Sequence, residues 1–484
     1  MHLETSVSEL QRQLSGHVLV PTQGAYSDAV QIDNGRVQLT PGFIVRVDST
    51  EDVVTCLRHA AKHGLRFTVK GGGHSATGYS LNTGGMVIDM SLLNAISLDR
   101  ERKLVTVQMG ARWYQVYTYL QQTGSGLIPI GGGCPTVGIP GFVQGGGYSF
   151  VSRSYGMSCD NLRSVTLVLA DGSVRTVGTD SVGAERDLFW ALRGGGGGNW
   201  GVVVSMQIAV HHPNTEKMLT AQLRFCAERA QQVLGFYNQW VETLPDAMAA
   251  YGIWSNSPDP ADPARLIPTF GFTIIYNGEF AEGARLLQPL LEQSPLTASI
   301  NALTLPQFEL INGASTLVKG RSAYIRAGVM PPGAFSPACI AIFEKYMACA
   351  PSPDSFLVWT HGGGRISKLA ADATAFPHRD GRFIPELKSI WDRPDQARAN
   401  IEWAHAFFAE LAPHFCGNYV NYIDPLLPDW QTQYYGDNYA RLEEVKQAVD
   451  PANVFRFQQS VGSTYQPCVA QPLALAPLNR TFLD

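Results

Sequence analysis

Two side chains that can form covalent bonds each follow a run of three glycines in the first third of the chain. His74 comes directly after Gly71 to Gly73, and Cys134 comes directly after Gly131 to Gly133. Glycine runs let backbone N–H groups approach a phosphate or a ring closely, because no side chain stands in the way. A lone histidine or cysteine is usually structural, but the two together favour attachment to a large planar cofactor.

The segment before His74 predicts a β-α-β unit that delivers the first glycine run. Residues 43–47 have the pattern of a strand, Ser49 and Asp52 form a capping pair at a helix start, and Gly64 suits the helix end. Residues 65–69 then give a second strand that leads into the glycines.

Two stretches formally match the dinucleotide fingerprint, but neither has its context. Gly71-x-Gly73-x-x-Ala76 leads into turn residues, and Gly196-x-Gly198-x-x-Gly201 leads into residues 202–208, which have the pattern of a strand. A Rossmann loop must open a helix that holds the pyrophosphate. The sequence therefore argues against a Rossmann nucleotide site.

Length and composition set wider limits. A chain of 484 residues exceeds one usual hydrophobic core, so we expect two domains, or one domain inserted into another. The net charge of -5 gives no basic surface for nucleic acid, no stretch is long and apolar enough to span a membrane, and the first residues lack a secretory signal. Eight cysteines, spread singly, exclude the spacings of zinc or dithiol sites. We expect a soluble protein without a metal site and leave its compartment and oligomeric state open.

Further motifs follow in one order along nearly the whole chain. They include Cys134-Pro135-Thr136-Val137-Gly138, Gly145-Gly146-Gly147-Tyr148, Asp160-Asn161, Phe376-Pro377-His378-Arg379, Asn421-Tyr422-x-Asp424, Asp450-Pro451-Ala452-Asn453 and Gln459-Ser460. In these motifs and in Gly72-Gly73-His74-Ser75 the chain resembles the berberine-bridge-enzyme family of FAD-linked oxidases, within the vanillyl-alcohol-oxidase superfamily.

The resemblance implies an α+β fold in which a two-part, PCMH-type FAD-binding domain carries an inserted α+β substrate domain with an antiparallel sheet. We place the FAD domain at residues 1–211 and the substrate domain at 212–415, with residues 416–484 completing the FAD domain. It also implies FAD bound through both His74 and Cys134. Further cofactor contacts are expected from Gly71, Gly72, Gly73, Ser75, Val137, Gly138, Gly145, Gly146, Asp160, Gly201 and Val203.

Tyr422 matches the catalytic base of many relatives, and Tyr148 matches a second active-site tyrosine of some. A phenol with a pKa of about 10 is a poor base at neutral pH, so Tyr422 needs a neighbouring cation or donor that the sequence does not identify. The alternative is that Tyr419 and Tyr422 belong to an aromatic strand face that packs between the domains. His378 and Arg379 are expected to be structural residues near the pocket.

The electron acceptor and the substrate are the least determined features. Val137 resembles the small residue of family oxidases, which leaves oxygen a route to the flavin. We therefore expect a small organic substrate, typical of secondary metabolism, to undergo alcohol oxidation or ring closure by hydride transfer to flavin N5, with oxygen reduced to hydrogen peroxide. The alternatives are a dehydrogenase with another acceptor, a redox-neutral cyclase or isomerase that retains FAD, and a carbohydrate oxidase.

One stretch departs from the family pattern. Residues 140–144 read Pro-Gly-Phe-Val-Gln where relatives often have a histidine-containing glycine loop, and Ser149 replaces a common glycine. Proline fixes φ and phenylalanine replaces a polar ring. This departure puts the local path of the cofactor loop, and with it the bond from Cys134, in question.

Overall fold

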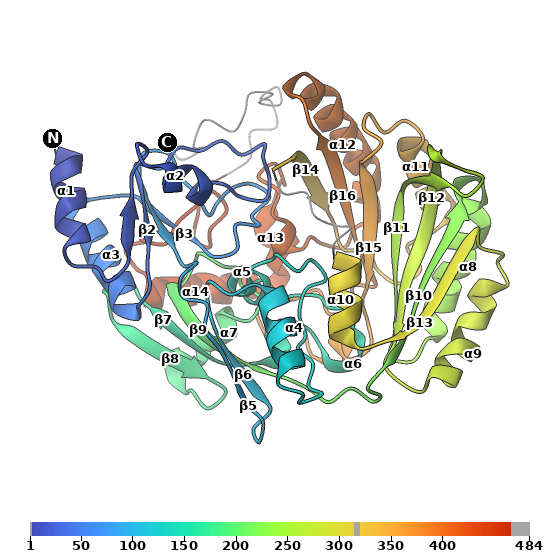
Figure 1. Ribbon diagram of the computed structural model, residues 1–484, viewed down its shortest axis with the longest axis horizontal. Coiled ribbons are helices and arrows are strands. Elements are labelled where there is room, and N and C mark those ends of the chain that lie inside the picture. The colour runs from blue at the N-terminus through green and yellow to red at the C-terminus, as the bar shows by residue number, and fades with distance from the viewer. Residues whose placement is uncertain (1, 314–319, 466–484) are drawn as a thin grey trace.

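Three β-sheets organise the chain into two lobes (Figure 1). The computed structural model describes residues 2–313 and 320–465. Two sheets of four and five strands build one lobe, and a seven-stranded sheet builds the other. This α+β architecture confirms the fold class expected from the motifs.

The four-stranded sheet carries the loop that ends in His74. Its strands β2, β4 and β3 are parallel, and α3 connects β2 to β3. The Ser49 side chain accepts a hydrogen bond from the Asp52 N–H at the start of α3, and Gly64 ends the helix at a φ of 61°. The predicted β-α-β unit is therefore confirmed. The bounds are β1 His17–Leu19, β2 Phe43–Arg46, α3 Thr50–His63, β3 Phe67–Lys70 and β4 Met86–Asp89.

The five-stranded sheet is antiparallel and has the order β5-β6-β9-β7-β8. Gly201 leads directly into β9, so the glycine run before it does not open a helix, as the sequence predicted. The strands are β5 Ile96–Asp99, β6 Leu104–Gln108, β7 Leu162–Val168, β8 Val174–Gly178 and β9 Val202–Ala209. The helices of this lobe are α1 His2–Gln11, α2 Gly24–Ala29, α4 Trp113–Gln122, α5 Ile139–Gln144, α6 Ser152–Tyr155 and α7 Gly183–Ala191.

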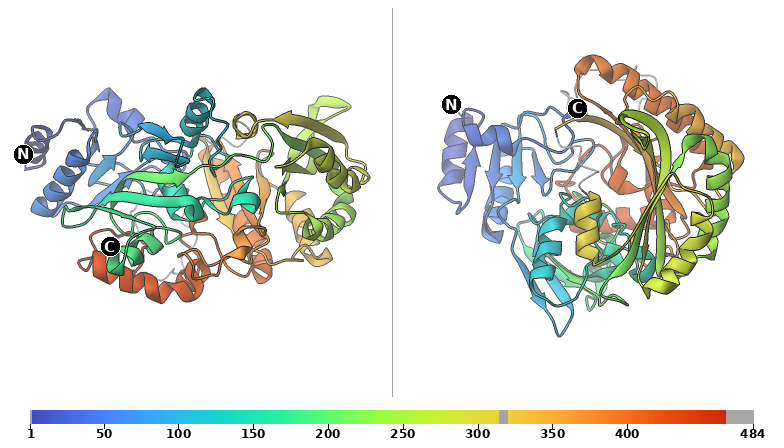
Figure 2. Two further views of the ribbon diagram at one scale, coloured as in Figure 1. Left: turned by 90° about the horizontal axis from the view of Figure 1, so that it is seen from below. Right: turned by 45° about the vertical axis from the view of Figure 1, so that its right-hand side comes forward.

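The seven-stranded antiparallel sheet has helices on its outer face, while its inner face is turned toward the other lobe (Figure 2). Alternation along a strand divides the two faces: Leu219, Ala221 and Leu223 of β10 are buried in the core beneath the helices, and Gln222 and Arg224 face inward. The strands are β10 Met218–Cys226, β11 Met248–Asp259, β12 Asp262–Tyr276, β13 Thr297–Leu303, β14 Ser322–Ala327, β15 Phe356–His361 and β16 Phe383–Trp391. The outer helices are α8 Ala230–Trp240, α9 Phe280–Leu291, α11 Pro337–Met347 and α12 Ala397–Leu411. Helix α10 (Leu305–Gly313) instead lies on the inner side, where it contacts α4 of the other lobe (Figure 1).

The last part of the chain returns to the first lobe. Helix α13 (Trp430–Tyr435) is followed by α14 (Tyr439–Val449), whose Leu442 and Val445 join the core of that lobe. The buried Lys446 ammonium donates to the carbonyl oxygens of Asn199 and Phe455 at 2.8 and 2.6 Å. The C-terminal segment thus fixes the end of the glycine run 194–198.

Two glycine loops meet backbone to backbone at the centre of the first lobe. A Cβ atom on Gly72 would lie 2.3 Å from the backbone nitrogen of Gly138, and a Cβ on Gly138 would lie 2.4 Å from the nitrogen of Gly72. Real Cβ atoms do not approach backbone so closely, so this contact requires glycine on both sides. It brings the loop of His74 against the loop of Cys134.

We predict that Gly72→Ala lowers the free energy of unfolding by about 3 kcal/mol, because the methyl group must push two backbone segments apart. Gly235→Ala is the matched control, since a Cβ at Gly235 in α8 meets no atom within 4 Å. This control should raise stability by about 0.5–1 kcal/mol through helix propensity. Urea denaturation of the two variants measures both effects, and a neutral Gly72→Ala would contradict the tight contact.

Candidate active site

A cavity of about 730 Å³ lies between the lobes. The glycine loops form one wall, and the inner face of the seven-stranded sheet forms the roof. This volume falls in the range of cofactor and small-molecule sites. Of the residues proposed from the sequence, those that line it are Gly71, Gly72, Gly73, His74, Ser75, Cys134, Val137, Gly138, Tyr148, Gly201, Val203 and Tyr422.

His74 and Cys134 lie at one side of this cavity and share a neighbour. The Thr136 hydroxyl is 2.9 Å from His74 Nε2 and 3.5 Å from Cys134 Sγ. Burial lowers the pKa of His74, while Asp33, whose Oδ2 lies 3.8 Å from Nδ1, opposes this shift in part. His74 is therefore a neutral imidazole at pH 7, the form that has a free electron pair for bond formation.

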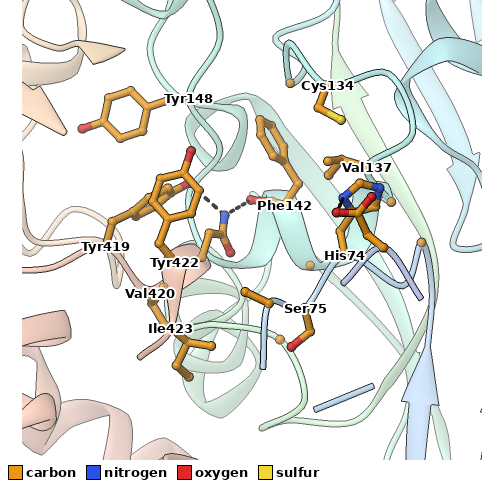
Figure 3. Close-up of a pocket in the computed structure, with 18 of the residues that line it drawn as sticks. His74, Ser75, Cys134, Val137, Phe142, Tyr148, Tyr419, Val420, Tyr422 and Ile423 are labelled. Atoms are coloured by element: carbon orange, nitrogen blue, oxygen red, sulfur yellow. Dashed lines mark hydrogen bonds and ion pairs between the residues drawn. The ribbon is translucent and has the colours of Figure 1, made fainter. Parts of the chain in front are cut away.

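An aromatic group occupies the opposite side, with Phe142 between it and His74 (Figure 3). Tyr422 packs edge-on against Tyr419 at 5.3 Å between ring centroids, and Tyr419 packs edge-on against Tyr148 at 5.5 Å. Tyr419 is held in place, since its hydroxyl accepts hydrogen bonds from the Gly147 and Asn421 N–H groups at 2.8 Å each. Tyr419 therefore packs among aromatic rings, as the alternative interpretation of the sequence expected. It does not lie in a strand, because it directly precedes a 3₁₀ turn (Val420–Tyr422).

Tyr148, Tyr419 and Tyr422 all line the cavity, but Tyr148 differs from Tyr419 in the state of its hydroxyl. The Tyr148 hydroxyl is buried and has no hydrogen-bond partner within residues 2–313 and 320–465. Burial raises the pKa of Tyr148, and neighbouring Tyr419 adds to the shift. Buried polar groups are normally hydrogen-bonded, so this free hydroxyl is available to a bound molecule.

Glu386 and Lys388 of β16 are site residues that the sequence reasoning missed. Both line the cavity roof, and the Lys388 ammonium lies 3.1 Å from the Glu386 carboxylate. Burial, and next the charge of Glu386, hold the pKa of Tyr422 well above its ordinary value. The charge that acts on Tyr422 is thus a carboxylate, which disfavours the phenolate, whereas the sequence reasoning expected a cation or donor that favours it. Alternation along residues 383–391 places both charges on one face of the strand, but this pattern does not tell a cavity roof from a solvent-exposed face.

Comparison with known proteins agrees with this geometry. A sequence profile described as FAD binding domain matches residues 41–178, and one described as berberine and berberine like matches residues 418–462. An uncharacterized FAD-linked oxidoreductase of Bacillus subtilis, YgaK, is 30% identical over 462 residues, covering 93% of this chain and 97% of its own. The chain belongs to the berberine-bridge-enzyme-like family of FAD-linked oxidoreductases.

More distant members share the fold. Reticuline oxidase of Eschscholzia californica is 26% identical over 454 residues, which is 87% of this chain and 83% of that protein. The structure of BBE-like 1 from Physcomitrella patens superposes with a TM-score of 0.85 at 24% identity, over 95% of this chain and 98% of that one. The resemblance stated from the motifs is confirmed.

The walls of the cavity fit the FAD of such an oxidoreductase. Eleven residues of its lining in the first lobe are glycines, which leave backbone N–H groups accessible to phosphate oxygens: Gly71, Gly72, Gly73, Gly132, Gly133, Gly138, Gly141, Gly196, Gly197, Gly198 and Gly201. Met90, Met109, Val137 and Phe142 give the same wall an apolar part, which suits a flat ring. No three His, Cys, Asp or Glu side chains gather as a metal site in the part of the chain that the structure describes. Among the helices described there, none is long and apolar enough to cross a membrane.

Three residues expected to contact FAD lie outside the cavity wall. Gly145 and Gly146 pack against Asn421 and Met157, where a Cβ would lie 2.0 and 2.7 Å from their side chains. Asp160 instead accepts two hydrogen bonds from Arg379 at 2.9 Å each. Asp160 and Arg379 thus form a buried ion pair outside the cavity lining.

The departure at residues 140–144 forms the short helix α5. Pro140 occupies the first turn, where a proline is tolerated. Phe142 fills the space against Gly132 and Gly147, where added Cβ atoms would lie 2.9 and 2.5 Å from its ring. The Gln144 carbonyl accepts hydrogen bonds from the N–H groups of residues 194 and 196. This stretch therefore organises the cofactor wall.

We predict that Asp160→Asn lowers the free energy of unfolding by about 3 kcal/mol, because it leaves the Arg379 guanidinium, 2% exposed, without its counter-charge. Arg398→Ala is the control, since it breaks an exposed pair with Glu402 and should cost less than about 1 kcal/mol. Both values come from denaturant titrations. Equal effects would show that the Arg379 pair contributes no more than a surface pair.

Proposed function

We propose that the protein is an oxidase that holds FAD by two covalent bonds, from His74 and Cys134, and oxidises a small organic substrate while oxygen is reduced to hydrogen peroxide. The observation that carries this proposal is the meeting of both side chains at one side of the glycine-walled cavity, with Thr136 between them. FAD, when bound, supplies the acceptor for the substrate hydride. Gly71 to Gly73 and residues 196–198 would hold its phosphates.

The acid-base chemistry is assigned to Tyr422 and Glu386 as a pair. Because its pKa is raised well above 10, Tyr422 is protonated at neutral pH and cannot act as a free phenolate base. It can instead receive a substrate proton while passing its own to the Glu386 carboxylate. Lys388 orients that carboxylate through their 3.1 Å ion pair. Tyr148 offers its free hydroxyl to the substrate.

Purification from the native source, followed by acid precipitation, tests the cofactor part. The flavin colour should stay with the pellet of the wild type and of Cys134→Ala, whose spectrum should change because one bond is lost. The double variant of His74→Ala and Cys134→Ala should release flavin to the supernatant. Cys349→Ala, at an exposed cysteine, is the control and should keep the wild-type spectrum. A wild type that releases its flavin would disprove covalent attachment.

Turnover with a panel of alcohols, phenols and sugars tests the acceptor. An oxidase should form about one hydrogen peroxide for each substrate oxidised under air. Turnover that needs an artificial acceptor, without peroxide, would instead identify a dehydrogenase, and conversion without any electron acceptor would identify a redox-neutral cyclase or isomerase.

We predict that Tyr422→Phe and Glu386→Gln each lower kcat roughly 100-fold or more, with no further multiplicative loss in the double variant, because the two residues move one proton. With wild-type Tyr422 protonated up to high pH, kcat should show no rise near pH 10 from phenol ionisation. Tyr114→Phe, at an exposed tyrosine outside the cavity, should leave kcat unchanged. Multiplicative losses would mean that the two residues act separately.

A further inference from the structure

A single row of residues crosses the cavity roof from a cation to a carboxylate. Strand register pairs Arg224 with Gly271, Gly271 with Ile253, Ile253 with Val358, and Val358 with Glu386. Directly paired residues of neighbouring strands project from the same face of a sheet. The row therefore has a charge at each end and only glycine, isoleucine and valine between them.

Arg224 differs from the other cation of the roof because it has no counter-charge. Lys388 is paired with Glu386, whereas no ion pair joins Arg224 to any carboxylate of residues 2–313 and 320–465. Its guanidinium donates to the Ser257 hydroxyl at 2.7 Å, and burial is the cause that lowers its pKa. Burial removes part of the hydration of this cation, and no neighbouring negative charge offsets that cost. An anion bound in the cavity would offset it.

The surroundings of Arg224 hold it in a defined direction. Ser257, which accepts its hydrogen bond, is itself 4% exposed and accepts another from Thr269 at 2.9 Å. Gly271 beside Arg224 adds no side chain, and a Cβ there would lie 2.2 Å from the Leu223 carbonyl oxygen. A planar guanidinium fixed in this way suits a carboxylate or another oxyanion.

We infer that Arg224 is the anchor for an anionic group on the substrate, a specificity site that rests on the proposed function. Four strand spacings of about 4.8 Å separate the backbones of Arg224 and Glu386 by about 19 Å. The substrate class is therefore an elongated molecule with an apolar body, an oxyanion at one end and the oxidised carbon at the other, beneath Glu386 and Tyr422. Ile253 and Val358 contact the apolar body.

Calorimetric titration of the purified flavoprotein with 2-naphthalenesulfonate and neutral 2-naphthalenemethanol tests this site. The wild type should bind the sulfonate more tightly, with affinity that falls as salt rises. Arg224→Met should weaken sulfonate binding roughly tenfold or more and change alcohol binding less than about twofold. Arg224→Lys should keep part of the preference because it keeps the charge.

Arg265→Met is the matched control, since Arg265 lies on the same sheet at 69% exposure, outside the cavity. It should bind both probes as the wild type does. Equal binding of the two probes by the wild type, or an equal loss of both in Arg224→Met, would overturn the anion site. Flavin absorbance, recorded on the same samples, separates this outcome from failure of the proposed function, which would show as a wild type without bound flavin.

Discussion

The site depends on one steric constraint, the contact between Gly72 and Gly138. Neither residue has room for a Cβ, so the loop after β3 and the loop before α5 lie backbone against backbone. This contact converts two positions 60 residues apart into neighbours that share the Thr136 hydroxyl. A side chain at either glycine would push the two loops apart and separate the imidazole from the thiol. The cavity wall that these loops form would move with them.

The glycine wall has few polar side chains, and two other parts of the molecule supply them. The seven-stranded sheet brings polar groups to the opposite side through Glu386 and Lys388, and the C-terminal segment brings Tyr422. Arg326 of β14 and Asp424, two residues after Tyr422, form a buried ion pair at 2.6 Å that joins these two parts. Three separate stretches of sequence therefore have to be folded together before a substrate can meet both a cofactor and a proton acceptor.

Much of this was predictable from the residues. The capping pair around Ser49, the helix end at Gly64 and the strand after Gly201 depend on local preferences, and the structure has them where the sequence placed them. The family and its fold followed from motifs in order. The contacts of Asp160 were not predictable, because its partner Arg379 lies 219 residues away and only the folded chain brings them together.

The charged roof was missed for a similar reason. A strand with charges at alternate positions, such as Glu386 and Lys388, has the same local pattern on a solvent-exposed sheet. Only the packing of that face over the glycine wall makes it a cavity roof. The backbone path of residues 140–144 was not predictable because relatives have a different sequence there. In the structure this stretch is a short helix, and the Phe142 ring fills the space between two glycines.

The most direct measurement is mass spectrometry of a tryptic digest of the natively purified protein. Trypsin cleaves after Lys70, Arg100, Arg112 and Arg153, so His74 and Cys134 fall in separate peptides, 71–100 and 113–153. If FAD is bound through both side chains, the digest should contain one species in which both peptides are joined through a single FAD. Recovery of both peptides unmodified, with FAD in the free fraction, would contradict this attachment.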